Sequence, residues 1–167
     1  MVISVRVDDR LIHGQVALVW TKELNTPGII VANDHAEKDD VLRMTLQMAV
    51  PTGKKLLVKS VENSIRVIND PRGKDMRIFA LTNCVKDVLR LVENCAENIQ
   101  SVNIANVGRF DKSDKSTQVQ LNSTIMLNPE ELEAARKLVT MGIPVYHQLI
   151  PENKQVPIVD LLKNVKR

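Results

Sequence analysis

The sequence predicts a single α/β domain with a mostly parallel central sheet, helices on both faces of that sheet and an antiparallel edge. Two observations support this fold class. Short runs rich in valine and isoleucine alternate with amphipathic stretches of helical length, a pattern typical of repeated strand-helix units. The chain has 167 residues, enough for one compact domain around such a sheet. We therefore expect residues 1–167 to form one domain.

Each predicted strand is an apolar run, rich in β-branched residues and bounded by polar or turn-forming residues. In chain order these strands are residues 2–7, 29–32, 56–59, 77–81, 101–107 and 143–150. Residues 118–127 also look extended, and we interpret them as a hairpin or as an antiparallel edge. The polar stretches 33–39 and 108–117 are interpreted as irregular connections.

The predicted helices show apolar residues at helical spacing, and some have clear end signals. In chain order they are about residues 14–24, 40–50, 61–69, 85–94, 129–141 and 157–165. Ser60 is suited to cap the third helix at its N-terminus. The fifth helix has the strongest start, with Asn128 as cap and Pro129 at the first helical position, and Gly142 is its stop.

The composition argues against a nucleic-acid-binding protein. Lysine and arginine total 23 against 20 acidic residues, so the net charge is only +3. Basic and acidic residues are interleaved along most of the chain. The aromatic residues that single strands or RNA would stack on are few and scattered: Trp20, Phe79, Phe110 and Tyr146. We therefore expect no nucleic-acid partner.

The chain shows no sign of export or of a metal centre. Its N-terminus turns acidic before a long apolar run develops, and no stretch approaches membrane-spanning length, so we expect a cytoplasmic protein. Cys84 and Cys95 are too far apart for a CxxC pair and have no nearby histidine, so we expect reduced thiols and no metal site.

A dense set of reactive side chains occupies the turn after the first predicted strand. Asp8, Asp9, Arg10 and His13 fall within six positions, and Gly14 opens the next predicted helix. In parallel sheets such a turn lies at the carboxyl edge, where reacting groups gather. His13 can act as a nucleophile if an acceptor, Asp8 or Asp9, holds its other ring nitrogen. The same residues would equally serve as a helix cap with a stabilising ion-pair network, and spacing alone does not separate these interpretations.

The turn has the parts that a phosphohistidine needs. A phosphoryl group on His13 would face the backbone amides of Gly14, Gln15 and Val16, and glycine removes a side chain that would block close approach. Arg10 would add a bidentate contact to the phosphate oxygens. Because phosphoryl transfer depends mostly on positioning and charge stabilisation, we expect no metal ion or other cofactor.

Residues 6–16, RVDDRLIHGQV, resemble the signature of enzyme IIB of the mannose/fructose/sorbose family of bacterial phosphotransferase systems (PTS), in which the histidine is phosphorylated. The match is long and contiguous. The similarity continues through residues 30–34, 42–46, 49–53, 106–108 and 157–162. The resemblance therefore covers essentially the whole chain.

The resemblance implies a phosphotransferase in which His13 accepts a phosphoryl group from the IIA component and passes it to a sugar. That sugar, a hexose or amino sugar, would be imported through the membrane components IIC and IID, which would hold the chain at the inner face of the membrane. The supporting residues would be Asp9, Arg10, Gly14 and Gln15, and, less directly, Arg6 and Asp8. The resemblance leaves the identity of the sugar open, and also whether the chain forms a homodimer.

One segment departs from the family pattern. After residues 106–108 the family usually has another small residue, whereas this chain has the charged stretch 109–115. We expect this stretch to border the site at a strand end and to alter partner docking or phosphate contacts.

Several alternatives remain at this point. One alternative is a phosphorylatable regulatory module that has lost sugar transfer. Another is a nucleotide-binding protein, although the turn of residues 8–13 lacks the glycines that nucleotide binding needs. Cys84 follows a strand end and is a competing nucleophile. His35 is expected to be solvated, and His147 to be structural or exposed.

Overall fold

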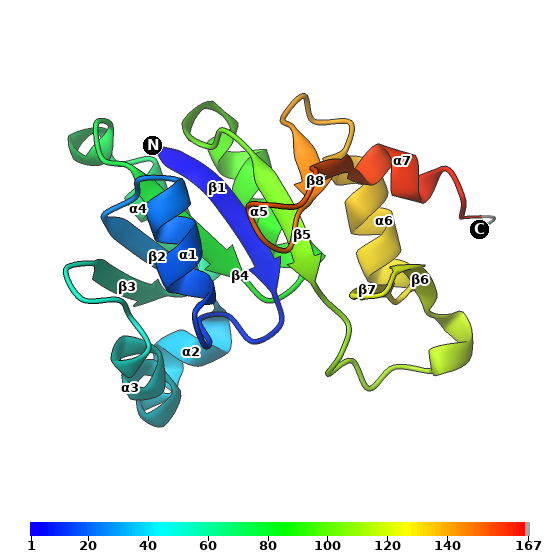
Figure 1. The fold of residues 1–167 in the computed structure, drawn as a ribbon, viewed down its shortest axis with the longest axis horizontal. Helices are drawn as coiled ribbons and strands as arrows, with labels where there is room; N and C mark the ends of the chain where they lie inside the picture. The colour runs from blue at the N-terminus through cyan, green and yellow to red at the C-terminus, as the bar shows by residue number, and fades with distance from the viewer. Residues whose placement is uncertain (166–167) are drawn as a thin grey trace.

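The computed structural model describes residues 1–165, whose strands form a central sheet and a small hairpin (Figure 1). The strands are β1 (Val2–Asp8), β2 (Gly28–Ala32), β3 (Lys55–Lys59), β4 (Ile78–Thr82), β5 (Val102–Asn106), β6 (Val119–Asn122), β7 (Ile125–Leu127), β8 (Val145–His147) and β9 (Val156–Pro157). The helices are α1 (Val16–Glu23), α2 (Asp34–Lys38), α3 (Asp40–Met48), α4 (Val61–Ile68), α5 (Val85–Cys95), α6 (Pro129–Leu138) and α7 (Ile158–Leu162). Short 3-10 turns lie at Pro71–Gly73, Ala96–Asn98 and Lys115–Thr117.

The central sheet has the strand order β3-β2-β4-β1-β5-β8-β9. Pairs from β3 to β8 are parallel, and β9 pairs antiparallel with β8. This confirms the predicted α/β class with a mostly parallel sheet and an antiparallel edge. Residues 118–127 form the predicted hairpin, β6 and β7, which is a separate sheet; the antiparallel edge is instead the two-residue strand β9.

Helices cover both faces of the sheet, as predicted, and each face has its own apolar core. One core packs buried residues of α1, α2 and α3 against the sheet, among them Ala17, Trp20 and Leu46. The other packs α4, α5, α6 and α7 against the opposite face, with Leu91 and Leu138 fully buried. Figure 1 shows β1 running between these two layers.

The alternation of side chains along β1 places charged groups beneath α1. Val5 and Val7 point into the core on the α5 side. Because successive strand residues point to opposite faces, Arg6 and Asp8 point to the α1 side, where the Arg6 guanidinium lies over the Trp20 ring at 5.5 Å from its centroid. A strand that must bury Arg6 and Asp8 needs partners for both charges.

Several element boundaries differ from the prediction. The first helix begins at Val16, because Gly14 has a left-handed φ of 52° that no helix contains. The supposed connection 33–39 contains helix α2, which the side chain of Asn33 caps by accepting from the Ala36 amide. Helix α6 starts as predicted but ends at Leu138.

No helix within residues 1–165 is both long and apolar enough to cross a membrane.

Candidate active site at the end of the first strand

In the loop after β1, the imidazole of His13 is partly exposed, whereas the two preceding side chains are buried. The Leu11 amide donates to the Asp8 carbonyl at 2.9 Å, and Leu11 itself has a left-handed φ of 57°. Leu11 and Ile12 are buried, whereas the side chain of His13 remains 21% exposed. The apolar pair therefore fixes the loop to the core and leaves the ring of His13 reachable from solvent.

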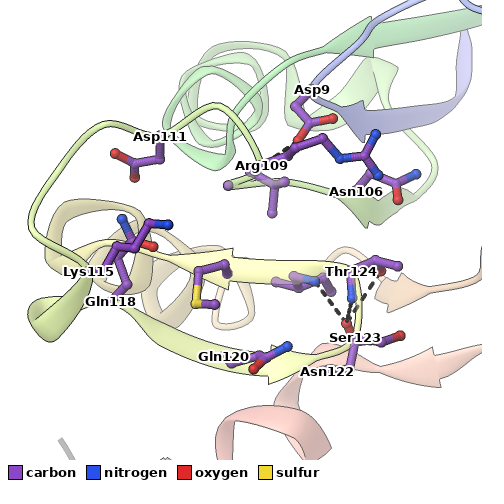
Figure 2. Close-up of a pocket in the computed structure, with 14 residues that line it drawn as sticks. Asp9, Asn106, Arg109, Asp111, Lys115, Gln118, Gln120, Asn122, Ser123 and Thr124 are labelled. Carbon is purple, nitrogen blue, oxygen red and sulfur yellow. Dashed lines mark hydrogen bonds between the residues drawn. The ribbon is translucent and has the colours of Figure 1, made fainter.

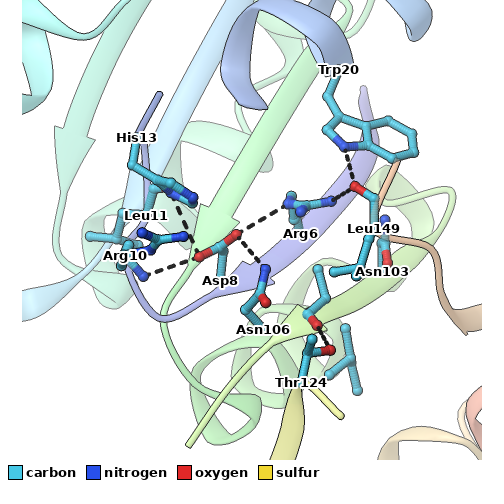
Figure 3. Close-up of polar contacts among 12 residues, drawn as sticks. Arg6, Asp8, Arg10, Leu11, His13, Trp20, Asn103, Asn106, Thr124 and Leu149 are labelled. Atoms are coloured by element: carbon cyan, nitrogen blue, oxygen red, sulfur yellow. Dashed lines mark hydrogen bonds and ion pairs between the residues drawn. The ribbon is translucent and has the colours of Figure 1, made fainter. Parts of the chain in front are cut away.

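The Nδ1 side of His13 faces two oxygen acceptors (Figure 3). The Leu11 carbonyl lies 3.4 Å from Nδ1, and Asp8 Oδ1 lies 3.8 Å from it. Both distances exceed an ordinary hydrogen bond, so the ring is oriented without being locked. Such a ring can present an unprotonated nitrogen to an incoming electrophile.

Asp8 is fully buried, and three neighbours hold its carboxylate. The Arg10 amide donates to Oδ1 at 3.1 Å, and Asn106 Nδ2 donates to Oδ2 at 3.1 Å. Arg6 Nε forms an ion pair with Oδ2 at 3.5 Å. A buried carboxylate with this many partners keeps a fixed position, so the side of the imidazole that it faces is also defined.

Arg6 is fully buried and supports Asp8 from behind. Its Nη1 donates to the backbone carbonyls of Gln148 and Leu149 at 3.4 and 3.3 Å, and Trp20 Nε1 donates to the same Leu149 carbonyl at 3.2 Å. Burial lowers the pKa of the Arg6 guanidinium from its usual value, and Asp8 opposes that shift. Arg6 therefore acts through Asp8 and does not itself reach the surface.

The two neighbouring carboxylates have different surroundings. Asp8 faces His13, whereas Asp9 turns toward the segment after β5, where its Oδ2 accepts from the Arg109 amide at 3.1 Å. The Asp9 amide donates to the Asn106 carbonyl at 2.9 Å. The residues alone left open whether Asp8 or Asp9 serves the imidazole, and the geometry selects Asp8.

Of the other predicted supporting residues, Arg10, Gly14 and Gln15 are all exposed around the histidine. Gly14 has a left-handed φ of 52°, which favours glycine, and a Cβ there would meet no protein atom within 4 Å. The Val16 amide donates to the His13 carbonyl at 3.3 Å and is therefore already occupied, contrary to the expected phosphate contact.

Sequence reasoning missed Asn106 and the backbone around Gln148. Asn106 ends β5, which pairs with β1 in the sheet. The available signals were a polar residue at the end of an apolar run and the family resemblance of residues 106–108. Residues 148 and 149 follow β8, and nothing in their local sequence indicates that their carbonyls bind a buried arginine.

The competing candidates have other roles in the fold. Burial, then Glu131, raises the pKa of the Cys84 thiol far above its usual range, so the reactive thiolate is disfavoured. His35 is 77% exposed and pairs with Asp39 at 3.3 Å. His147 Nδ1 lies 2.8 Å from the Ile104 carbonyl, a structural contact. Among residues 1–165 no cluster of three or more acidic, histidine or cysteine side chains could hold a metal ion.

Comparisons with known proteins identify the family of this chain. The family model described as PTS system sorbose subfamily IIB component matches residues 2–167. A probable phosphotransferase enzyme IIB component of Streptococcus pyogenes is 50% identical over 163 residues, covering 97% of this chain and 99% of that protein. The crystal structure of the IIBSor domain of the Klebsiella pneumoniae sorbose permease superimposes with a TM-score of 0.88 at 31% identity, covering 100% of this chain and 99% of that one.

A further relative is longer than this chain. The mannose-specific EIIAB component of Escherichia coli K12 is 34% identical over 162 residues, which cover 97% of this chain and 48% of that protein. The chain thus spans about half of that relative. From the family match and these identities, this chain belongs to the sorbose subfamily of PTS IIB components.

Proposed function

We propose that the chain is a phosphocarrier in which His13 accepts a phosphoryl group from a IIA component and passes it to a sugar, a hexose or amino sugar, imported through IIC and IID. Membership of the IIB family supports the phosphotransferase class. The E. coli relative is named EIIAB, which supports a IIA protein or domain as the donor. In this role the chain works at the inner face of the membrane, against IIC and IID.

One observation carries the proposal: a partly exposed imidazole stands at the end of the central strand, backed by a fully buried carboxylate. Asp8 is held by Arg6, Asn106 and the Arg10 amide before any substrate arrives. A preset partner for the imidazole reduces the reorganisation that the reaction requires.

The chemistry requires two displacements at phosphorus. In the first, the lone pair of an unprotonated His13 nitrogen forms a bond to phosphorus, and the bond from phosphorus to the IIA histidine nitrogen breaks with its electron pair. In the second, a sugar hydroxyl attacks phosphorus, the bond to His13 breaks, and the hydroxyl proton is released. Arg10 is exposed and lies beside His13 in Figure 3, which supports a contact from its guanidinium to the phosphate oxygens.

Phosphoryl labelling tests the first displacement. The protein is incubated with phosphorylated upstream carriers, and the acid-labile label on it is measured. We expect His13→Ala to lose the label, because the nucleophile is gone. His35→Ala is the matched control, since the side chain of His35 is exposed and pairs with Asp39, away from the His13 loop. Full labelling of His13→Ala would remove His13 from the mechanism.

Sugar uptake tests the second displacement. Cells that carry the matching membrane components are supplied with wild-type protein or with His13→Ala. We expect uptake to require His13, because the sugar receives its phosphoryl group from that residue. Undiminished uptake with His13→Ala, together with normal labelling of the wild type, would instead identify the regulatory module considered above.

A further inference from the structure

Two of the five residues of β5 are asparagines, on an otherwise apolar strand that pairs with β1. A buried amide side chain is costly unless it is hydrogen-bonded, so each should have a defined partner. Asn106 donates to Asp8 and also lines the cleft between the segment after β5 and the β6–β7 hairpin (Figure 2). Asn103 is buried and is not part of the lining of that cleft, so its contacts are with the protein itself.

The register between the two strands places each asparagine beside a charged residue of β1. Arg6 pairs with Asn103, and a shift in the register at the end of β1 then brings Asp8 beside Asn106. Paired residues of parallel strands point to the same face of the sheet, so Asn103 lies on the α1 side with Arg6, as Figure 3 shows.

The side chain of Asn103 holds residue 148 as a neighbouring strand would. Its Oδ1 accepts from the Gln148 amide at 3.0 Å, and its Nδ2 donates to the Gln148 carbonyl at 2.9 Å. The pairing of β5 with β8 extends to Tyr146, so these two hydrogen bonds begin where the pairing of the strands ends. Asn103 therefore attaches the segment after β8 to the sheet.

That segment carries the two carbonyls that hold Arg6. The Gln148 carbonyl accepts from Arg6 Nη1 at 3.4 Å, and the Leu149 carbonyl accepts from Arg6 Nη1 at 3.3 Å and from Trp20 Nε1 at 3.2 Å. The bonds from Arg6 are near the upper limit of hydrogen-bond length, so a small displacement of the segment would break them. The guanidinium would then lose its fixed position beside Asp8.

We propose that Asn103 is a positioning residue for phosphoryl transfer at His13. It fixes the two carbonyls after β8, these carbonyls hold Arg6, and Arg6 pairs with the Asp8 carboxylate that faces the imidazole. The inference rests on the proposed function, because it assigns Asn103 a role in that reaction. Its effect on the imidazole passes through Arg6 and Asp8.

The position of these groups is measured first, by nuclear magnetic resonance of the unphosphorylated full chain. Trp20 is the single tryptophan, so its indole NH gives one 15N signal, which reports on the bond to the Leu149 carbonyl. We expect Asn103→Ala to shift this signal and also the signals of the His13 ring nitrogens. Asn103→Ser keeps a hydroxyl near the Gln148 amide, should shift the same signals by less, and replaces Asn103→Ala if that variant does not fold.

Ser101→Ala is the matched control, because it also removes a side-chain hydrogen bond between these two strands. Ser101 Oγ donates to the Ile3 carbonyl at 2.8 Å, near the start of β1 and therefore at the opposite end from His13. Its loss should leave the indole and imidazole signals unchanged. A shift of the imidazole signals in this control would mean that they respond to any weakening of the sheet.

Labelling kinetics separate positioning from a merely structural role. With saturating phosphorylated IIA, Asn103→Ala should slow labelling of His13 by about tenfold, while KM for the donor stays within about twofold, because a displaced reacting group lowers the rate without changing the docking surface. Ser101→Ala should label at the wild-type rate. Added to Asp8→Asn, Asn103→Ala should cause no further loss, because both substitutions break the same series of contacts.

The proposal is overturned if Asn103→Ala labels at the wild-type rate, if its loss multiplies with that of Asp8→Asn, or if Ser101→Ala loses as much. These outcomes differ from a failure of the phosphocarrier role. Wild-type protein that takes no label at His13 refutes that role. Normal wild-type labelling with multiplying losses refutes only the positioning by Asn103.

Discussion

Two neighbouring strand ends of the sheet have similar topology and opposite surroundings. β1 and β4 pair in parallel, and each leads into a helix, α1 or α5. At the start of α5 the Glu131 carboxylate accepts from the amides of Val85 and Lys86 at 2.8 and 2.7 Å. At the start of α1 the capping residue Gln15 makes no side-chain hydrogen bond. A protein carboxylate caps the start of α5, whereas no side chain caps the start of α1, where the Val16 amide instead donates to the His13 carbonyl.

The candidate nucleophiles at these two strand ends, Cys84 and His13, also have different surroundings. Cys84 precedes the start of α5, where burial and then Glu131 raise the pKa of its thiol. His13 precedes the start of α1 and is partly exposed. The two strand ends therefore show that a reactive side chain after a parallel strand can have very different surroundings. A carboxylate of the protein at a helix start takes the amides that an anion would otherwise bind.

The largest expected effect is on the rate of phosphoryl labelling, when the buried carboxylate of Asp8, after β1, is removed. Asp8→Asn should slow phosphoryl labelling of His13 by about 100-fold, because the neutral amide no longer orients and stabilises the imidazole as the carboxylate does. The rate is measured with phosphorylated IIA in excess, after urea unfolding shows that the variant is folded.

Glu131→Gln is the matched control at the start of α5, because it makes the same chemical change in another buried carboxylate. Its labelling rate should stay within about twofold of wild type, since its partners belong to α5. If Asp8→Asn and Glu131→Gln slowed labelling equally, the carboxylate beside His13 would have no special role in the reaction.

The next largest effect is on stability at the start of α5. Glu131→Gln should lower the free energy of unfolding by about 2 kcal/mol, because one of the two α5 amides loses its acceptor and faces an amide NH₂ instead. Urea denaturation monitored by circular dichroism measures this change. An unchanged midpoint would mean that the carboxylate does not stabilise the helix start.

The smallest expected effect is a pH dependence. Burial raises the pKa of Glu131 above its usual value of 4.5, and the amides of Val85 and Lys86 oppose that shift. Between 4.5 and the raised value the folded state binds more protons than the unfolded state, so stability falls as pH rises. The slope is at most about 1.4 kcal/mol per pH unit.

Glu131→Gln lacks this titration, so its stability deficit relative to wild type should be smaller at neutral pH than near pH 4.5. Urea midpoints collected for both proteins across this range measure the difference. A deficit that grows with pH would mean that the folded protein lowers the pKa of Glu131.

Most of the fold was predictable because local signals and burial agree. The apolar runs of the strands and the Asn128-Pro129 start of α6 are local features, and the structure confirms the α6 start and most of the strands; of the predicted strand 143–150, only β8 (Val145–His147) forms. Helix α2 was missed because four of its five residues are polar and Ala36 alone gives no apolar periodicity; the Asn33 cap was the clue. The edge strand β9 has two residues, too few to make a pattern.

The candidate site was predictable only in part. His13 and its neighbours are contiguous, so the turn could be recognised from spacing and family resemblance. The choice of Asp8 over Asp9, and the contribution of Asn106, depend on which face of β1 each side chain occupies and on which strand lies beside it. The order of the strands and the face that each side chain occupies are set when the sheet assembles, so they could not be predicted from one sequence.

The hydrogen bonds from Arg6 to the carbonyls of Gln148 and Leu149 have a consequence for protein synthesis. Their partners are separated by 142 and 143 positions along the chain. The network behind Asp8 therefore cannot form until residues 148 and 149 have left the ribosome, long after the turn that carries His13 has been made.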